Sequence, residues 1–246
     1  PNNLSLFLGR VLPLTLAISL FGTGKNRRLA YGAASLPMVV CLFLTFSRGA
    51  WLLGVPAAIL FLGLMRGRRA FLAALGGVGA AILALLPFAG LARLTSLLSL
   101  QEGTTQRRLA LWKAALQMIR DHPIFGVGLD NFLYHYPRYI LPEAWQEPDL
   151  SHPHNLVLHW WVSLGVFGVG VLIWLQIAFW RSSLRLYQRL KEPDLRLLTL
   201  GLMASMVDFL AHGLVDQSYF LVDLAFIFCL TLGIIRRMET FERREV

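Results

Sequence analysis

The sequence predicts an all-α polytopic membrane protein with about seven transmembrane helices, and three observations support this fold class. Hydrophobic residues make up 56% of the 246 residues, and the mean hydropathy of +0.59 exceeds that of a soluble domain. Apolar runs long enough to cross a bilayer recur along the chain. The basic residues behind the net charge of +9 lie in short clusters between these runs, which indicates membrane topology signals rather than nucleic-acid binding.

The predicted transmembrane helices follow from runs of roughly 17 to 25 mostly apolar residues. Such runs lie at 4–23, 29–47, 49–65, 70–91, 155–180, 197–216 and 219–235. If the runs alternate across the membrane, four basic clusters fall on one side, and the positive-inside rule places that side in the cytoplasm. The clusters contain Lys25, Arg27, Arg28; Arg66, Arg68, Arg69; Arg181, Arg185, Arg189, Lys191, Arg196; and Arg236, Arg237, Arg243, Arg244.

We expect a single membrane domain over 1–246 that forms the C-terminal part of a longer protein. The chain begins at Pro1, without an initiator methionine or the pattern of a signal peptide. Its longest connection, residues 92–154, falls on the outer side and is predicted to be a periplasmic loop. The expected location is therefore the bacterial inner membrane, with this loop facing outward.

The outer loop is predicted to contain an amphipathic helix that lies along the membrane surface. Thr104 and Thr105 fit a helix cap. The apolar residues that follow fall on one face at helical spacing; they are Leu109, Trp112, Leu116 and Ile119. Pro123 is expected to end this helix, and Gly126 and Gly128 then supply turn positions.

Two arginines stand where they can bind phosphate. Arg48 lies between two apolar runs, at the outer membrane boundary, and Gly49 lets another group approach it. An arginine there can reach lipid headgroups or bind phosphate oxygens in a bidentate manner, and we favour the second role. Arg108, beside Arg107, lies four residues before Trp112 and therefore on the same side of the predicted helix. Its spacing alone also fits a basic residue at headgroup level.

Charged and polar residues within the apolar runs are expected to face the protein interior. Arg10 is one, in the first run, and it can either face the interior or extend to the lipid headgroups. Asp208, His212 and Asp216 recur every four residues and are predicted to form one stripe through the run 197–216. This stripe can be an ion or proton path, or an internal network that orients a catalytic group.

Five of the six histidines fall in or just after the outer loop, namely His122, His135, His152, His154 and His159. His154 lies where the chain re-enters the membrane, and we expect it to act as a base, because imidazole titrates near neutral pH. A structural or capping histidine is the alternative. We expect no metal site, because the spacing lacks a His-x-x-x-His pair or a carboxylate placed to complete one. The single cysteines, Cys41 and Cys229, add no metal motif.

With these residues in view, the chain resembles the C-terminal membrane domain of the O-antigen ligase and O-antigen polymerase superfamily. The order and spacing of several motifs carry the resemblance rather than any single motif. They lie at 47–49, 108–132, 152–156, 165–168 and 212–216. The segment that begins at Pro1 is similar to the family's segment before a central helix, which implies that further N-terminal helices belong to the protein.

The resemblance implies an inverting, metal-independent glycosyltransferase without a cofactor. Such an enzyme moves a glycan from undecaprenyl diphosphate to an acceptor hydroxyl in cell-surface polysaccharide or lipopolysaccharide biosynthesis. Carried over, Arg48 and Arg108 would bind the diphosphate and His154 would activate the acceptor. Supporting roles would fall to Trp112, Asn155, His212 and Asp216.

The resemblance leaves the acceptor and the reaction open. The acceptor can be a lipid, a growing glycan or a protein, and relatives in the superfamily include protein O-oligosaccharyltransferases and proteins labelled bicarbonate transporters. A transporter that uses the stripe from Asp208 to Asp216 is therefore the principal alternative, and a glycan-binding scaffold is a third. The expected partners are the lipid-linked glycan, its acceptor and membrane lipids, and not nucleic acid.

Overall fold

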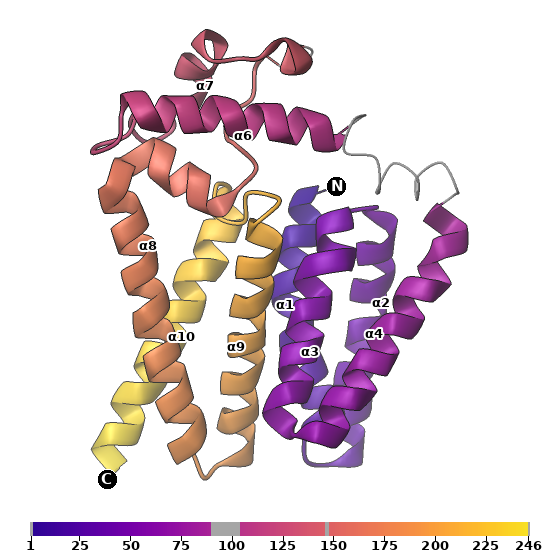
Figure 1. The fold of residues 1–246 in the computed structure, drawn as a ribbon. Coiled ribbons are helices and arrows are strands. Elements are labelled where there is room, and N and C mark those ends of the chain that lie inside the picture. The colour runs from indigo at the N-terminus through magenta and orange to yellow at the C-terminus, as the bar shows by residue number, and fades with distance from the viewer. Residues whose placement is uncertain (1, 90–103, 146–147, 246) are drawn as a thin grey trace. The chain divides into compact units, whose positions relative to one another are not determined.

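The computed structural model describes residues 2–89, 104–145 and 148–245, and these residues form helices and turns without strands (Figure 1). The elements are α1 (Asn2–Phe21), α2 (Lys25–Leu44), a π-helix η1 (Ala50–Gly54), α3 (Val55–Arg66), α4 (Arg68–Ala89), α6 (Thr104–Asp121), α7 (Phe132–His135), the 3-10 turns η2 (Tyr136–Arg138) and η3 (Pro142–Ala144), α8 (Leu156–Arg189), α9 (Pro193–Gly213) and α10 (Val222–Glu245). The chain forms two compact units. The first comprises Pro1–Ala80, Gln176–His212 and Ser218–Val246, and the second comprises Ala81–Leu175 and Gly213–Gln217.

The seven predicted runs coincide with α1, α2, η1 together with α3, α4, α8, α9 and α10. Among the described residues, four helices are long and apolar enough to cross a membrane, namely α1, α2, α8 and α9. The chain is therefore a multi-pass membrane protein, while the count of seven spans and the periplasmic position of the loop stay predictions. The end of the run 70–91 and the first residues of the loop 92–154 lie outside the described residues.

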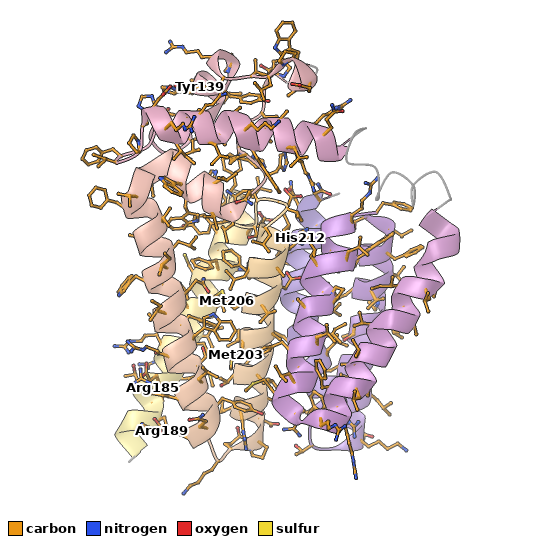
Figure 2. The ribbon with its side chains drawn as sticks, viewed as in Figure 1. Tyr139, Arg185, Arg189, Met203, Met206 and His212 are labelled. Atoms are coloured by element: carbon orange, nitrogen blue, oxygen red, sulfur yellow. The ribbon has the colours of Figure 1, made fainter. Side chains whose placement is uncertain are left out.

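The first unit is a bundle in which α9 is buried along most of its length. Met203 and Met206 of α9 are inaccessible to solvent, and Figure 2 labels both along this helix. Gly201 lets α9 approach α1 closely, because a side-chain carbon there would lie 2.9 Å from the Cα atom of Leu14. A second cluster, built around Leu12 and Leu42, joins α1 to α2 and η1.

Ionic contacts connect α8 and α10 at one end of the first unit. The buried carboxylate of Glu239 on α10 accepts hydrogen bonds from Ser182 at 3.0 Å and from Arg236 at 2.9 Å, and it lies 3.6 Å from Arg185. Arg185 and Arg189 both extend from α8 in this region (Figure 2). Part of the third basic cluster is therefore engaged in ion pairs.

The second unit is built around α6, which packs against α7 and the first part of α8 (Figure 1). The helix ends at Asp121, as Pro123 predicts, and it begins at Thr104, although the side chains of Thr104 and Thr105 lie outside the described residues. The buried face of α6 matches the predicted apolar face only at Ile119. Leu109 and Leu116 are 39% and 50% exposed, whereas the buried face carries Leu111, Ala114, Ala115, Met118 and Ile119. Small alanines, which a search for large apolar residues overlooks, allow the closer packing.

A backbone contact fixes the segment that follows α6 to α8. Gly165 has non-helical dihedral angles (φ 64°, ψ −155°) and interrupts α8. The break frees the carbonyl groups of Val162 and Ser163, which accept hydrogen bonds from the N–H groups of Val127 at 2.7 Å and Gly128 at 3.1 Å. We call this contact the Gly165 latch. It joins two glycine motifs that lie far apart in the sequence.

Candidate active site

The segment that carries Arg48 is a tightly bonded turn in the first unit. The turn follows α2 and includes Phe46 with a positive φ of 53°, a strained conformation for an aromatic residue. Trp51 stabilises it, because its ring stacks on Phe43 at 5.5 Å and its indole nitrogen donates a hydrogen bond to the carbonyl oxygen of Leu42 at 3.0 Å. Arg48 is partly exposed and lies two residues before the π-helix η1, which begins at Ala50. Such irregular helical turns often occur at functional sites.

Asp208 occupies a buried position beneath this π-helix. Its side chain is inaccessible to solvent and packs between Gly9 of α1 and Gly54 of η1, where a side-chain carbon on either glycine would overlap the carboxylate. Arg10 is also buried, as its interior orientation predicts, and its guanidinium lies 4.3 Å from the ring centre of Phe209. Arg10 and Asp208 are thus two interacting ionisable side chains buried inside the first unit.

The predicted stripe from Asp208 to Asp216 is not continuous. Asp208 and His212 lie on α9 and are both inaccessible to solvent (Figure 2 labels His212). The helix ends at Gly213, so Asp216 does not share its periodicity and belongs to the second unit. Gly213 favours termination, since glycine carries a high entropic cost in a helix. The helical spacing that predicted an ion or proton path through all three residues therefore does not extend to Asp216.

Asp216 instead contacts His154, 62 residues earlier in the chain. The Nδ1 atom of His154 lies 2.7 Å from the Oδ1 atom of Asp216, and the N–H of Gln217 also donates to this oxygen, at 2.8 Å. Asp216 is 4% exposed. Burial by itself would raise the pKa of its carboxyl, but the hydrogen bond and charge of His154, the Gln217 N–H and Arg108 outweigh burial and lower the pKa to about 2. The carboxylate is thus ionised at neutral pH.

An ionised carboxylate can only accept a hydrogen bond, so the Nδ1 atom of His154 must carry the proton. When the ring is neutral, its Nε2 atom has a lone pair and can accept a proton. His154 also has a positive φ of 47°, and a conformation that is uncommon outside glycine fits a functional residue. The arrangement resembles the carboxylate and histidine pairs that orient a general base.

Asn155 holds the backbone around this pair. Its side-chain oxygen accepts a hydrogen bond from the N–H of Leu158 at 3.0 Å, which caps the start of α8, and its amide nitrogen donates to the carbonyl oxygen of Leu214 at 2.8 Å. One side chain therefore connects the start of α8 to the segment that carries Asp216. The supporting role predicted for Asn155 agrees with these contacts.

Arg108 adds a cation to the pair. Its NH2 atom lies 3.8 Å from the Oδ2 atom of Asp216, and its side chain is 32% exposed. The guanidinium carries further donors that can face a bound anion. Trp112, one turn along α6, is half-buried. Its supporting role stays a prediction.

His152 lies beside His154, with 4.4 Å between the ring centres. Burial, followed by the charges of His154 and His159, lowers the pKa of His152 to about 3, although Asp216 opposes this shift. His152 is therefore neutral at pH 7. Its Nδ1 atom is 3.1 Å from the hydroxyl of Ser151.

The prediction of no metal site relied on the lack of a nearby carboxylate, and this premise is wrong. Asp216 lies beside both histidines, and ligand atoms of His152, His154 and Asp216 fall within 4.8 Å of one another. Two ligands of one tetrahedral zinc ion would be separated by about 3.3 Å, given bonds of about 2.0 Å. The 2.7 Å contact between His154 and Asp216 is shorter, which favours a hydrogen bond over shared coordination.

The structure thus brings together four of the predicted site residues in the second unit, namely Arg108, His154, Asn155 and Asp216. Arg48 and His212 belong to the first unit, so their part in the same site stays a prediction. Sequence reasoning missed the direct contact between His154 and Asp216 and the neutral His152. A separation of 62 positions in the sequence leaves no spacing signal for the contact between His154 and Asp216.

Comparison with known proteins places these residues in a family. A family model described as O-antigen ligase matches residues 33–175, which include Arg48, Arg108 and His154. The O-antigen ligase of Salmonella typhimurium (strain LT2) is 28% identical over 151 residues, which is 56% of this chain and 36% of the relative. The chain therefore spans about a third of the length of that relative.

Proposed function

The chain belongs to the O-antigen ligase family, and we propose that it transfers a glycan from undecaprenyl diphosphate to an acceptor hydroxyl in cell-surface polysaccharide biosynthesis. The observation that carries the proposal is the 2.7 Å contact between His154 and Asp216. This contact holds the proton on Nδ1 and leaves Nε2 as the atom that can act as a base. The acceptor is a lipid core, a growing glycan or, as in a protein O-oligosaccharyltransferase, a protein.

The proposed reaction is one displacement at the anomeric carbon. The acceptor oxygen forms a bond to this carbon on the face opposite the diphosphate, while the bond to the diphosphate oxygen breaks, so the configuration inverts. The hydroxyl proton passes to the Nε2 atom of His154. Asp216 balances the positive charge that then forms on the imidazole ring.

The departing diphosphate gains negative charge, and arginines can stabilise it. Arg108 lies next to the pair, and Arg48 lies two residues after Phe46, whose positive φ marks the turn between α2 and η1. Guanidinium groups bind phosphate oxygens in a bidentate manner and remain protonated. We infer that these two cations take the place of a divalent metal, and that the site faces the periplasm.

The test measures glycan transfer by the full-length protein, reconstituted with a lipid-linked donor. Arg48→Ala, Arg108→Ala and His154→Asn are each expected to lower transfer by about 10²- to 10⁴-fold. The matched controls are Arg120→Gln on the same helix as Arg108, and His122→Asn in the outer segment. Full activity in all three variants would reject the proposal.

Metal independence needs its own measurement, because His152, His154 and Asp216 are close enough to raise the question. We expect transfer to continue in EDTA, and added Zn²⁺ to inhibit rather than activate, since zinc would compete with the proton on His154. Loss of transfer in EDTA that Zn²⁺ or Mg²⁺ restores would overturn this part of the proposal.

A transporter is the second candidate, and the buried Arg10, Asp208 and His212 favour it, since ionisable groups inside a bundle often mark ion paths. It predicts solute flux, for example of bicarbonate, in proteoliposomes without lipid-linked glycan. Flux that Asp208→Asn abolishes would support the transporter. Transfer without flux would support the ligase.

A further inference from the structure

A cavity of about 710 Å³ lies where α1 ends and α2 begins, within the first unit. Small residues open it, because Gly32 and Ala33 of α2 face the end of α1. At Gly32 the helices are close, since a side-chain carbon there would lie 3.0 Å from the hydroxyl oxygen of Ser19. Cavities of about 300 to 1,000 Å³ hold small ligands.

The walls of this cavity are apolar and accessible. Leu20, Leu29 and Leu36 line it and are 49%, 61% and 66% exposed. In a helix pair that is apolar enough to cross a membrane, such side chains meet acyl chains rather than water. A free inorganic anion would gain nothing from these walls.

The rim of the cavity is basic. Lys25 and Arg28 line it, both are exposed, and none of the described lining residues is acidic. The Nε atom of Arg28 donates a hydrogen bond to the carbonyl oxygen of Ser19 at 2.9 Å, which fixes the guanidinium at the rim. Arg27, by contrast, forms an ion pair with Asp194. Two cations are thus directed at the cavity.

The cavity is remote from the Arg48 turn. The 20 residues of α2 separate Lys25 from that turn, which corresponds to about 30 Å of helix, or about the thickness of the hydrocarbon core. The two basic positions therefore lie at opposite membrane surfaces. The cavity cannot be the diphosphate site proposed at Arg48.

From the basic rim, the apolar walls and the position at a membrane surface, we propose that this cavity binds one phospholipid with an anionic headgroup. Lys25 and Arg28 bind the phosphate, and an acyl chain lies along Leu29 and Leu36. Basic pockets between transmembrane helices recognise anionic lipids in this manner. The site does not depend on the proposed transfer reaction.

The test measures lipid binding to the purified full-length protein in detergent, by native mass spectrometry, with phosphatidylglycerol and phosphatidylcholine as probes. The wild type is expected to retain one phosphatidylglycerol molecule in preference to phosphatidylcholine. Lys25→Gln/Arg28→Gln should weaken this binding by about ten- to thirty-fold, since each basic residue contributes about fivefold. Ala33→Phe should also weaken it, because it fills the cavity and leaves both charges in place.

Arg68→Gln/Arg69→Gln is the matched control, because it removes two exposed charges from the next basic cluster. It should bind phosphatidylglycerol like the wild type, and the catalytic variant Arg108→Ala should do so too. Equal binding of both lipids, an equal loss in the control, or displacement of phosphatidylglycerol by millimolar inorganic phosphate would overturn the proposal. If the charge variant fails to fold, Ala33→Phe decides.

Discussion

At the scale of single residues, Asp216 determines which nitrogen of His154 can react. The histidine alone could hold its proton on either nitrogen, and a ring protonated at Nε2 would present the wrong atom to an acceptor. The carboxylate removes this ambiguity, because it accepts from Nδ1 at 2.7 Å and is itself held in place by the N–H of Gln217. A neutral amide at position 216 would not impose the same choice.

Asp216→Asn is therefore expected to lower the rate constant for transfer by about 10²- to 10⁴-fold, with a smaller change in the KM for the donor. The measurement is steady-state transfer with the lipid-linked donor. Asp130→Asn, at an exposed turn of the same unit, is the control and should retain activity. A larger effect on KM than on the rate constant would contradict the orienting role.

His152 should make stability depend on pH. Its folded pKa of about 3 lies below the ordinary 6.5, so the folded state favours the neutral ring. This contribution to stability is complete above pH 6.5 and falls as the pH drops from there toward 3, by at most about 1.4 kcal/mol per pH unit. The pKa of Asp216 is lowered too, so its contribution is complete above about pH 4 and falls only below that value.

Thermal unfolding in detergent between pH 7.5 and 5 tests the role of His152. The wild type should lose stability over this range, and His152→Asn should flatten the dependence. The corresponding change at another histidine of the outer segment, His135→Asn, should not. Parallel curves for the wild type and His152→Asn would show that the burial of His152 does not govern the acid response.

At the scale of elements, the break in α8 is required rather than tolerated. Gly165→Ala would force a side chain into a positive-φ position and onto the carbonyl oxygen of Ile124. We expect a destabilisation of about 2 to 4 kcal/mol, measured by thermal unfolding. Gly170→Ala in the same helix has open space and should be neutral or stabilising. Equal behaviour of the two variants would refute the latch.

The contact between the π-helix η1 and α9 should also depend on a glycine, here Gly54. Gly54→Ala overlaps the carboxylate of Asp208 and should cost stability and reduce transfer, since Arg48 lies six residues earlier. Asp208→Ala should also destabilise, because it leaves Arg10 buried without a nearby anion. The double variant should cost less than the two single costs combined, since one change makes room for the other. Strict additivity would show that Gly54 and Asp208 do not interact.

At the scale of the whole molecule, the distribution of basic residues predicts orientation. Single cysteines can test it after Cys41 and Cys229, both exposed, are replaced by serine. Asn26→Cys and Arg68→Cys should resist a membrane-impermeant maleimide in intact cells, whereas Asp130→Cys should react once the outer membrane is permeabilised. Labelling of all three positions from the same side would contradict the orientation.

Hydropathy predicted where helices form, because a run of apolar residues determines a transmembrane helix with little help from its neighbours. Pro123 likewise predicted the end of α6 from local chemistry. The buried face of α6 was not predictable, since it depends on how Ala114 and Ala115 fit Phe132 and Val162 of other elements. The contact of His154 with Asp216 was also not predictable from the sequence, because it depends on where α9 ends and on the path of the residues that follow it.

The Gly165 latch also determines which substitutions the sequence can accept during evolution. Its hydrogen bonds join backbone groups, which every residue except proline carries in full, so the contact makes no demand on the side chains at 127, 162 and 163 beyond their fit in the core. The glycines at 126, 128 and 165 have no such freedom, because all three have positive φ and a side-chain carbon at any of them would lie within 2.7 Å of another atom. Related sequences can therefore exchange the other residues around the latch while keeping these three glycines.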